Sequence, residues 1–101
     1  MALSDEHLRQ KIAKLPNQPG VYQYFDQTGT IIYIGKAKNL KNRVSSYLSK
    51  ANQSHKTRAL VNKISDFQYI IVNSEQDALL LENNFIKKYK PRYNISLNDD
   101  K

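Results

Sequence analysis

Cysteine is absent from this chain of 101 residues, and glycine, proline and histidine are all scarce. Without cysteine there can be no disulfide, no thiol nucleophile and no zinc–thiolate site. Only His7 and His55 are present, and neither has a partner at the spacing of a metal site or a catalytic triad. Three glycines are too few for a phosphate-binding P-loop, and no Gly-x-x-x-x-Gly-Lys-Ser/Thr motif occurs. The common thiol, zinc–thiolate and P-loop activities are therefore excluded.

Long apolar runs are also missing. No segment approaches the roughly 20 residues that a membrane helix needs. The charged residues Asp5, Glu6, Arg9, Lys11 and Lys14 exclude the hydrophobic region of a secretory signal at the N-terminus. We therefore expect a soluble cytoplasmic protein that does not associate with membranes. The length favours one domain over residues 1–101, which we expect to be monomeric.

Acidic residues are missing from Gln27 to Ser65, a stretch that contains eight basic residues, and the net charge is +7. A second basic cluster lies near the C-terminus. A surface of one sign attracts polyanions, and nucleic acid is the commonest polyanion in a cytoplasm. A basic surface that serves only solubility is the alternative. The residues that we expect to bind DNA are Lys38, Lys41, Lys56, Arg58, Lys87, Lys88, Lys90 and Arg92.

Hydrophobic periodicity and turn residues predict four helices and three strands, which is an α/β (α+β) fold. The expected helices cover residues 4–15, 39–49, 56–65 and 74–89, beginning at the capping residues Ser4 and Asn39 for the first two and at a capping-box spacing for the last. The expected strands cover residues 21–26, 31–35 and 67–72, while residues 93–97 are expected to be extended or a short strand. The strand at 67–72 is almost continuously apolar, which favours a central position in the sheet.

Two tyrosine-bearing triplets, Gly20-Val21-Tyr22 and Tyr33-Ile34-Gly35, lie on the first two strands, with Gly29 in the turn between them. Period-2 alternation places apolar side chains on one side of this hairpin, namely Val21, Phe25, Ile32 and Ile34, and we expect that side to be core. The other side displays Tyr22, Tyr24, Tyr33 and Gly35. A turn centred near residues 27–28 would set Tyr22 opposite Tyr33. Two adjacent phenols followed by Lys36 indicate a reaction site.

A tyrosine is a poor base, because its unperturbed pKa is about 10. It can accept a proton near neutral pH only when a nearby cation lowers that pKa or a relay removes the proton. Lys36, three residues after Tyr33, is a candidate for that cation. Arg43 and Tyr47, spaced i and i+4, share a helix face that suits a phosphate oxygen. For this pair alone, an ordinary solvated helix face is the simpler explanation.

Glu82 is the most unusual single residue of the chain. It lies in the middle of an apolar helix stripe that consists of Ala78, Leu79, Phe85, Ile86 and Tyr89. A carboxylate in such a stripe is costly unless something pairs with it. Two partners remain open at this point: an arginine or lysine in a structural ion pair, or a divalent cation.

Several motifs follow one another in a recognisable order: Gly20-Val21-Tyr22, Tyr33-Ile34-Gly35-Lys36-Ala37, then Leu40, Arg43 and Tyr47, then Ala78-Leu79-Leu80-Leu81-Glu82 and Pro91-Arg92-Tyr93-Asn94. This order resembles the GIY-YIG nuclease family, and within it the N-terminal endonuclease domains of the bacterial excision-repair UvrC branch. The resemblance covers about residues 15–101. It departs from the family pattern at Val21, where the eponymous residue is isoleucine, and at Asn98, where a basic residue is usual.

The resemblance implies a small three-stranded antiparallel sheet flanked by helices, in a domain that forms the N-terminal part of a longer chain. It also implies phosphodiester hydrolysis with one divalent metal ion, Mg²⁺ or Mn²⁺, held by Glu82. Tyr33 would be the general base, tuned by Lys36, with Tyr22 as the competitor for that role. Tyr22 and Tyr47 would hydrogen-bond the water or the phosphate, Arg43 would stabilise charge on the phosphoryl group, and Asn94 would position active-site groups or substrate.

Within the UvrC branch, the resemblance implies the incision on the 3′ side of a DNA lesion during nucleotide excision repair. A UvrB-like protein would present the damaged DNA. Two other classes of function stay open: a non-catalytic nucleic-acid-binding module on the same scaffold, and a basic structural protein of a ribonucleoprotein.

Overall fold

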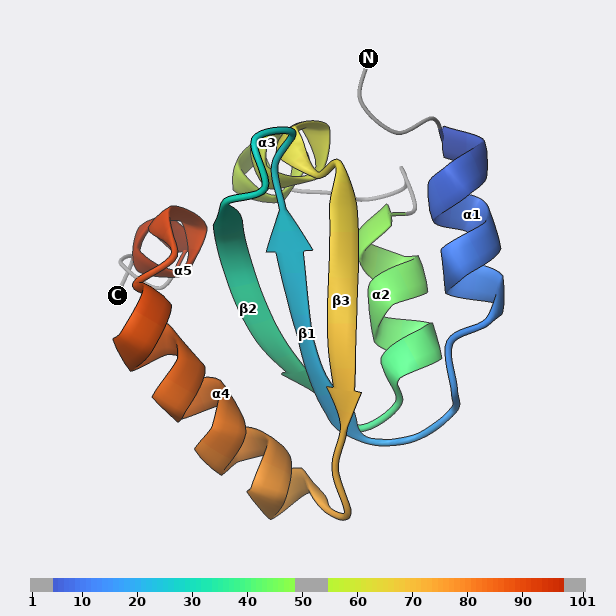
Figure 1. The fold of residues 1–101 in the computed structure, drawn as a ribbon, viewed down its shortest axis with the longest axis vertical. Coiled ribbons are helices and arrows are strands. Elements are labelled where there is room, and N and C mark those ends of the chain that lie inside the picture. The colour runs from blue at the N-terminus through green and yellow to red at the C-terminus, as the bar shows by residue number, and fades with distance from the viewer. Residues whose placement is uncertain (1–4, 49–54, 98–101) are drawn as a thin grey trace.

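The computed structural model describes residues 5–48 and 55–97. Within them, three strands and five helices follow one another along the chain, and Figure 1 shows their arrangement. The elements are α1 (Asp5–Ala13), β1 (Gly20–Phe25), β2 (Ile31–Ala37), α2 (Leu40–Leu48), α3 (His55–Lys63), β3 (Asp66–Ile71), α4 (Glu75–Tyr89) and α5 (Arg92–Leu97). The predicted strands and the first four helices are confirmed to within a few residues. None of the described helices is long and apolar enough to cross a membrane.

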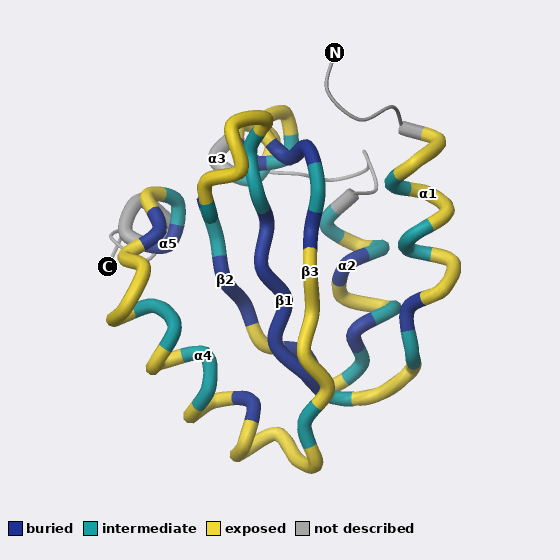
Figure 2. The backbone as a smooth tube through the Cα atoms, viewed as in Figure 1, coloured by how far each residue is buried: buried dark blue, intermediate teal, exposed yellow. Residues whose placement is uncertain are grey.

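The three strands form one antiparallel sheet in the order β2-β1-β3. The predicted antiparallel sheet flanked by helices is therefore confirmed, but the prediction that residues 67–72 form the central strand is wrong. The central strand is β1, and β3 lies at an edge. In β3 only Phe67 is buried, and the exposed fractions of Tyr69, Ile70 and Ile71 are 38%, 40% and 47% (Figure 2). An apolar run describes the side chains of a strand, but it does not show whether other elements cover that strand.

Each face of the sheet is covered by a different set of helices (Figure 1). The larger core lies on the side of α1, α2 and α3, and its buried members are Leu15, Tyr22, Tyr24, Ile32, Ala37, Leu40, Val44, Leu60, Ile64 and Phe67. The smaller core lies under α4 and consists of Val21, Ile34 and Ala78, with partly buried neighbours such as Leu81 and Phe85. The expectation that only the apolar side of the hairpin is core is therefore wrong, because the tyrosine side is the larger core.

The register of the hairpin also differs from the prediction. Tyr22 pairs with Gly35 and Tyr24 pairs with Tyr33, so Tyr22 and Tyr33 are not directly opposite. The pairing shifts between Tyr24 and Phe25, which leaves Ile32 as the extra residue of a β-bulge. The bulge breaks the simple alternation and brings Ile32 into the core on the tyrosine side. Gly29, with φ of 85°, turns the chain as expected.

Local hydrogen bonds explain where the helices begin. The Asn39 side chain accepts from the Asn42 backbone N–H at 3.0 Å, and the Ser74 hydroxyl accepts from that of Asp77 at 3.2 Å. Both predicted N-termini are therefore confirmed. Ser4, the predicted cap of the first helix, lies outside the described residues.

The extended segment predicted at residues 93–97 is wrong, because this segment is the short helix α5. Lys90 adopts a left-handed conformation, with φ 46° and ψ 57°, which turns the chain at the end of α4. Pro91 then precedes a new helix, and the Asn94 backbone N–H donates to its carbonyl at 3.1 Å. Proline ends one helix here and is compatible with the start of the next, because a helix start leaves the backbone N–H unused.

Candidate active site

Four tyrosines from three elements form one cluster on the α2 side of the sheet. Tyr22 and Tyr24 come from β1, Tyr33 from β2 and Tyr47 from α2, and every pair of rings lies between 5.1 and 6.3 Å apart. The Tyr47 hydroxyl donates to the Tyr33 hydroxyl at 3.2 Å. The structure therefore brings together all three tyrosines that the sequence predicted as site residues.

Tyr24 was not predicted as a site residue. Its ring is fully buried, and its hydroxyl has no hydrogen-bond partner among the described residues. The period-2 alternation with Tyr22 places both rings on one face of β1, and that was the signal available in the sequence.

Gly35 creates the space for the Tyr22 phenol. These two residues are paired across β1 and β2, and a Cβ atom on Gly35 would overlap the Tyr22 ring. The glycine of the second triplet and the tyrosine of the first therefore depend on each other. The pairing explains in steric terms why these two residue types occur together.

Arg43 lies on the same side as the phenols. Its guanidinium carbon is 4.9 Å from the Tyr47 ring centroid, and its side chain hydrogen-bonds the Tyr22 phenol. The predicted shared face of Arg43 and Tyr47 is thus real and is not an ordinary solvated face, because the guanidinium reaches two rings of the cluster. A cation in this position can neutralise a phosphoryl oxygen that approaches the phenols.

Burial sets the proton affinity of the phenols. It raises the pKa of Tyr22 and of Tyr33 well above the ordinary value for tyrosine, and the neighbouring phenols add to the rise. The charge of Arg43 opposes both shifts. In the protein alone these hydroxyls are therefore protonated at neutral pH and can donate hydrogen bonds. To act as a base, either tyrosine needs additional positive charge nearby.

Lys36 does not supply that charge in the way the sequence suggested. Along β2, Tyr33 and Gly35 lie on one face and Lys36 on the other. Lys36 pairs with Val21, whose side chain belongs to the core under α4. Lys36 therefore projects from the opposite face of the sheet to Tyr33. Arg43 is the cation whose charge lowers the pKa of Tyr33.

Glu82 lies on the face of α4 that packs against the sheet and is half-buried. Burial raises the pKa of its carboxyl, while the charge of Lys36 and a hydrogen bond from the Lys36 backbone N–H oppose the rise. In the described part of the chain, the ion pairs within 4.0 Å join Asp66 to Lys11 and His7. Glu82 is therefore not locked in a structural ion pair, which removes one of its two predicted partners.

Asn94 reaches β2 from α5 and is almost fully buried. Its side-chain oxygen accepts from the Ile34 backbone N–H at 2.7 Å, and its side-chain nitrogen donates to the Ile34 carbonyl at 2.8 Å. The amide group thus takes the place of a neighbouring strand at the free edge of β2. This geometry favours the positioning of β2, between Tyr33 and Gly35, as the role of Asn94.

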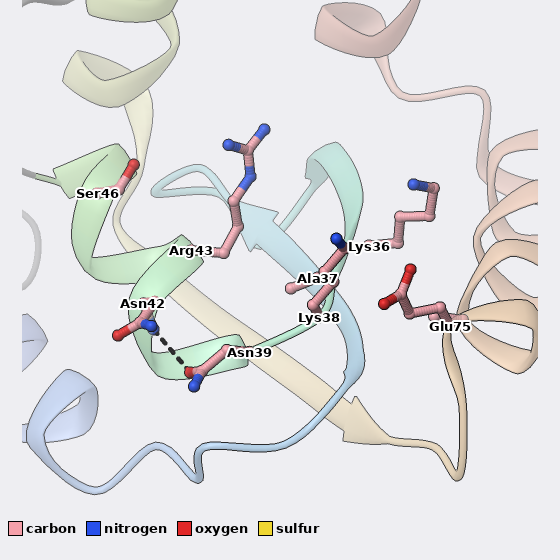
Figure 3. Close-up of a pocket in the computed structure, with 9 residues that line it drawn as sticks. Lys36, Ala37, Lys38, Asn39, Asn42, Arg43, Ser46 and Glu75 are labelled. Atoms are coloured by element: carbon pink, nitrogen blue, oxygen red, sulfur yellow. Dashed lines mark hydrogen bonds between the residues drawn. The ribbon is translucent and has the colours of Figure 1, made fainter.

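A pocket of about 510 Å³ lies next to these residues, between the end of β2, the start of α2 and the start of α4 (Figure 3). It is lined by Lys36, Ala37, Lys38, Asn39, Asn42, Arg43, Ser46, Glu75 and Ala78. Sequence reasoning missed Asn42, Ser46 and Glu75. A signal existed for Glu75, because a spacing of seven residues places it on the same face of α4 as Glu82.

The basic residues predicted to bind DNA are spread over several elements. Lys38 lines the pocket, and Arg58 is exposed on α3. Lys41 donates to the Ala13 carbonyl at 3.2 Å, so its ammonium also holds the segment after α1. The Lys56 side chain lies outside the described residues. The other four are exposed around the end of α4 and the start of α5, namely Lys87, Lys88, Lys90 and Arg92.

Comparisons with known proteins agree on one family. Residues 18–95 match the family described as the UvrC-like GIY-YIG domain. UvrABC system protein C of Bacteroides thetaiotaomicron is 65% identical over 100 residues, which is 99% of this chain and 16% of that protein. The corresponding protein of Flavobacterium johnsoniae is 56% identical over 99 residues, covering 98% of this chain and 17% of that protein. The chain thus spans about one sixth of the length of these curated relatives.

A solved structure shows the same fold. The magnesium-bound GIY-YIG N-terminal endonuclease domain of UvrC from Thermotoga maritima superposes with a TM-score of 0.78 at 42% sequence identity. The match covers 89% of this chain and 98% of that domain. The strand order and the helices described above therefore belong to an arrangement that is known from experiment.

Proposed function

This chain belongs to the UvrC-like GIY-YIG domain family, and from this membership and the geometry of its site we propose that it is a divalent-metal-dependent endonuclease domain that hydrolyses a phosphodiester bond of DNA. The observation that carries the proposal is the half-buried Glu82 carboxylate, which has no ion pair within 4.0 Å among the described residues and meets β2 beside Lys36. The Tyr22, Tyr33 and Tyr47 phenols and the Arg43 guanidinium lie on the other face of the same hairpin.

The residues present fit one divalent ion better than a multi-ligand site. No group of three or more histidine, cysteine, aspartate or glutamate residues gathers among the residues that the structure describes. Glu82 would hold the ion alone, with water and phosphate oxygens as the other ligands, and Mg²⁺ commonly keeps several such oxygens. When bound, the ion would polarise the phosphoryl group and stabilise the leaving oxygen. Burial raises the pKa of the Glu82 carboxyl, and a bound cation would oppose that rise.

The side chains of the tyrosine cluster would perform the remaining tasks. Arg43 would stabilise charge on the phosphoryl group, since its guanidinium already contacts two phenols. Tyr22 and Tyr47 would orient the attacking water or the phosphate through their hydroxyls. Tyr33 would act as the base only after losing its own hydroxyl proton to solvent, which the positive charge of a bound metal ion would favour. Tyr47, which donates a hydrogen bond to the Tyr33 oxygen, would stabilise the phenolate that takes the proton of the water.

The cellular role follows from the family. We propose that the domain makes the 3′ incision at DNA lesions as the N-terminal part of a UvrC protein in the cytoplasm. It would act as a monomeric unit on DNA presented by a UvrB-type protein. The exposed basic residues on α3, on α4 and at the start of α5 would contact the DNA backbone.

The test of the proposed function is the substitution Glu82→Gln, assayed by Mg²⁺-dependent nicking of a lesion-bearing duplex and of supercoiled plasmid. We expect nicking to fall by at least about a thousandfold, the scale of losing a metal ion that stabilises charge, while DNA binding persists. Asp77→Asn is the matched control, because it removes one negative charge from an exposed position on the same helix. A parent domain that binds DNA but shows no metal-dependent nicking would instead support the non-catalytic binding module.

A further inference from the structure

The pocket at the end of β2 shares one residue with the tyrosine cluster, namely Arg43. Its side chain reaches the phenols and also lines the pocket between β2, α2 and α4 (Figure 3). Asn42 and Ser46 are spaced i and i+4 on α2, so they share a face of the helix that is turned by about 100° from the position of Arg43. The pocket therefore adjoins the place that the proposed function gives to the phosphoryl group.

Three polar side chains that line this pocket are available to a ligand. Lys38, Asn42 and Ser46 are exposed, and within the described parts of the chain none of their side chains forms a hydrogen bond or an ion pair. Asn39 differs, because its oxygen accepts from the Asn42 backbone N–H and its amide nitrogen donates to Asn17. An ammonium, an amide and a hydroxyl can all donate to the same anionic group.

The charges around the pocket favour an anion on the side of α2. Lys36, Lys38 and Arg43 contribute three positive charges to the lining, and Glu75 contributes one negative charge. Glu75 lies at the start of α4, across the pocket from α2 (Figure 3). Because its carboxylate repels a phosphate, the favourable position for a phosphate is against α2.

The remaining lining of the pocket is apolar and small. Ala37 at the end of β2 and Ala78 on α4 are both buried, with 7% and 1% of their surface exposed. Their methyl groups suit the carbon atoms of a sugar ring, which needs no charged partner. The volume of about 510 Å³ lies within the range of pockets that hold small ligands. A phosphate together with its deoxyribose therefore matches both the charged and the apolar part of the pocket.

We propose that the pocket is a nucleotide subsite, which binds the phosphate and sugar next to the scissile phosphate of the cleaved strand. Lys38, Asn42 and Ser46 donate to this neighbouring phosphate. The inference rests on the proposed function, because it takes Arg43 as the residue that contacts the scissile phosphate. A contact with a phosphate carries no sequence information, so the subsite holds the strand in register without selecting a base. It contributes equally to the binding of the ground state and of the transition state.

The test is the double substitution Asn42→Ala/Ser46→Ala, which removes two donors without changing the net charge. Single-turnover nicking of duplex DNA in Mg²⁺ is measured over a range of protein concentrations. The concentration at half-maximal rate is expected to rise about tenfold, the scale of losing two hydrogen bonds to an anion, while the maximal rate stays within about twofold. Ser45→Ala/Asn84→Ala is the matched control, because it removes the same two groups outside the pocket, and it should change neither value. A pair variant that behaves like this control, or that lowers the maximal rate instead, would overturn the inference.

A change in the substrate identifies the phosphate that the pocket binds. Once the cut is mapped on unmodified DNA, a single uncharged methylphosphonate replaces the phosphate on the 5′ or on the 3′ side of the scissile one. In the parent, one of these replacements is expected to raise the half-saturating concentration about tenfold. In Asn42→Ala/Ser46→Ala, the same replacement should add less than about threefold, because the donors are already missing. Equal losses in the parent and the variant, or no loss at either position, would contradict the subsite. A parent without Mg²⁺-dependent nicking of unmodified DNA would instead overturn the proposed function.

Discussion

The two edge strands of the sheet are similarly rich in apolar residues but have different environments. β2 (IIYIGKA) and β3 (DFQYII) are both mainly apolar, and within the described parts of the chain each pairs only with β1. β2 is covered by α4 on one face and by the tyrosine cluster on the other, and Asn94 closes its free edge. β3 is buried only at Phe67, and its second half faces outward (Figure 2).

This contrast shows where the site is assembled. Tyr33, Gly35 and Lys36 belong to β2, and Glu82 and Asn94 contact that strand from α4 and α5. Among the described residues, β3 pairs with β1, contributes Phe67 to the larger core and attaches α1 through Asp66. Hydrophobic sequence is therefore shared by the two strands, whereas function depends on which elements cover them. Changes on β2 are expected to alter activity, and changes in the exposed second half of β3 to alter stability slightly or not at all.

The largest effect is expected from Tyr33→Phe, which removes one hydroxyl from β2. Turnover should fall by at least about a hundredfold, because the proposed base and its hydrogen bond with Tyr47 are both lost. The measurement is the single-turnover nicking rate at saturating DNA and Mg²⁺. Tyr69→Phe makes the same chemical change on β3, where the side chain is 38% exposed, and it should leave the rate unchanged. Near-parent turnover in Tyr33→Phe would refute the base assignment.

Asn94→Ala tests whether the hydrogen bonds of Asn94 at the edge of β2 are necessary for the stability of the fold. The substitution leaves the Ile34 backbone N–H and carbonyl without their side-chain partners in a buried position. We expect a loss of about 2–3 kcal/mol in the free energy of unfolding. Urea denaturation measures it, with the exposed Asn84→Ala on α4 as the matched control. A loss of unfolding free energy below about 1 kcal/mol would show that water replaces the hydrogen bonds of the amide at this edge of β2.

Much of this arrangement could be predicted from local signals. The tyrosine triplets predicted the hairpin, and the capping residues Asn39 and Ser74 predicted two helix starts. The apolar stripe around Glu82 identified that carboxylate as unusual. These signals work because period, cap and turn chemistry act over a few residues. They give the elements and most of the candidate residues without any knowledge of packing.

The parts that could not be predicted depend on distant contacts. The bulge at Ile32 shifts the register, so the partner of Tyr22 is Gly35 and not Tyr33. Asn94 is sixty residues from Ile34, and no local pattern reports that hydrogen bond. The exposure of β3 depends on where α4 lies, because α4 packs across β2 and β1. Glu75 lines the pocket with residues of β2 and α2 because the start of α4 comes near the end of β2.

A smaller effect is expected from Lys11→Met, which detaches α1 from the start of β3. The Lys11 ammonium donates to the Asp66 carboxylate and to the Phe67 carbonyl, both at 2.6 Å. Because the pair is partly exposed, we expect a loss of at most about 1 kcal/mol near neutral pH, measured by urea denaturation. Lys11→Met also removes the ammonium that lies 4.8 Å from the Phe67 ring centroid, so the measured loss includes this cation–π contact.

The pH dependence of that stability gives the sign of the interaction. Partial burial alone would raise the pKa of Asp66, but the Lys11 and Phe67 hydrogen bonds and the nearby positive charges hold it below its ordinary value. The stabilisation is therefore complete above the unfolded pKa of about 3.9 and is lost as the pH falls through the lower folded value. Between pH 5 and pH 2, stability should fall more steeply in the parent than in Lys11→Met. Parallel curves would show that the pair adds nothing.

The smallest effect is expected from Ile71→Thr on β3. Threonine keeps the β-branched shape that suits a strand, and the side chain that it replaces is 47% exposed, so little apolar burial is lost. The free energy of unfolding should change by less than about 0.5 kcal/mol. Ile34→Thr makes the same exchange at a fully buried position of β2, and it should cost about 2–3 kcal/mol because it places a hydroxyl in the core under α4. Equal losses at the two positions would mean that β3 is as well covered as β2, and the difference between the two edges would disappear.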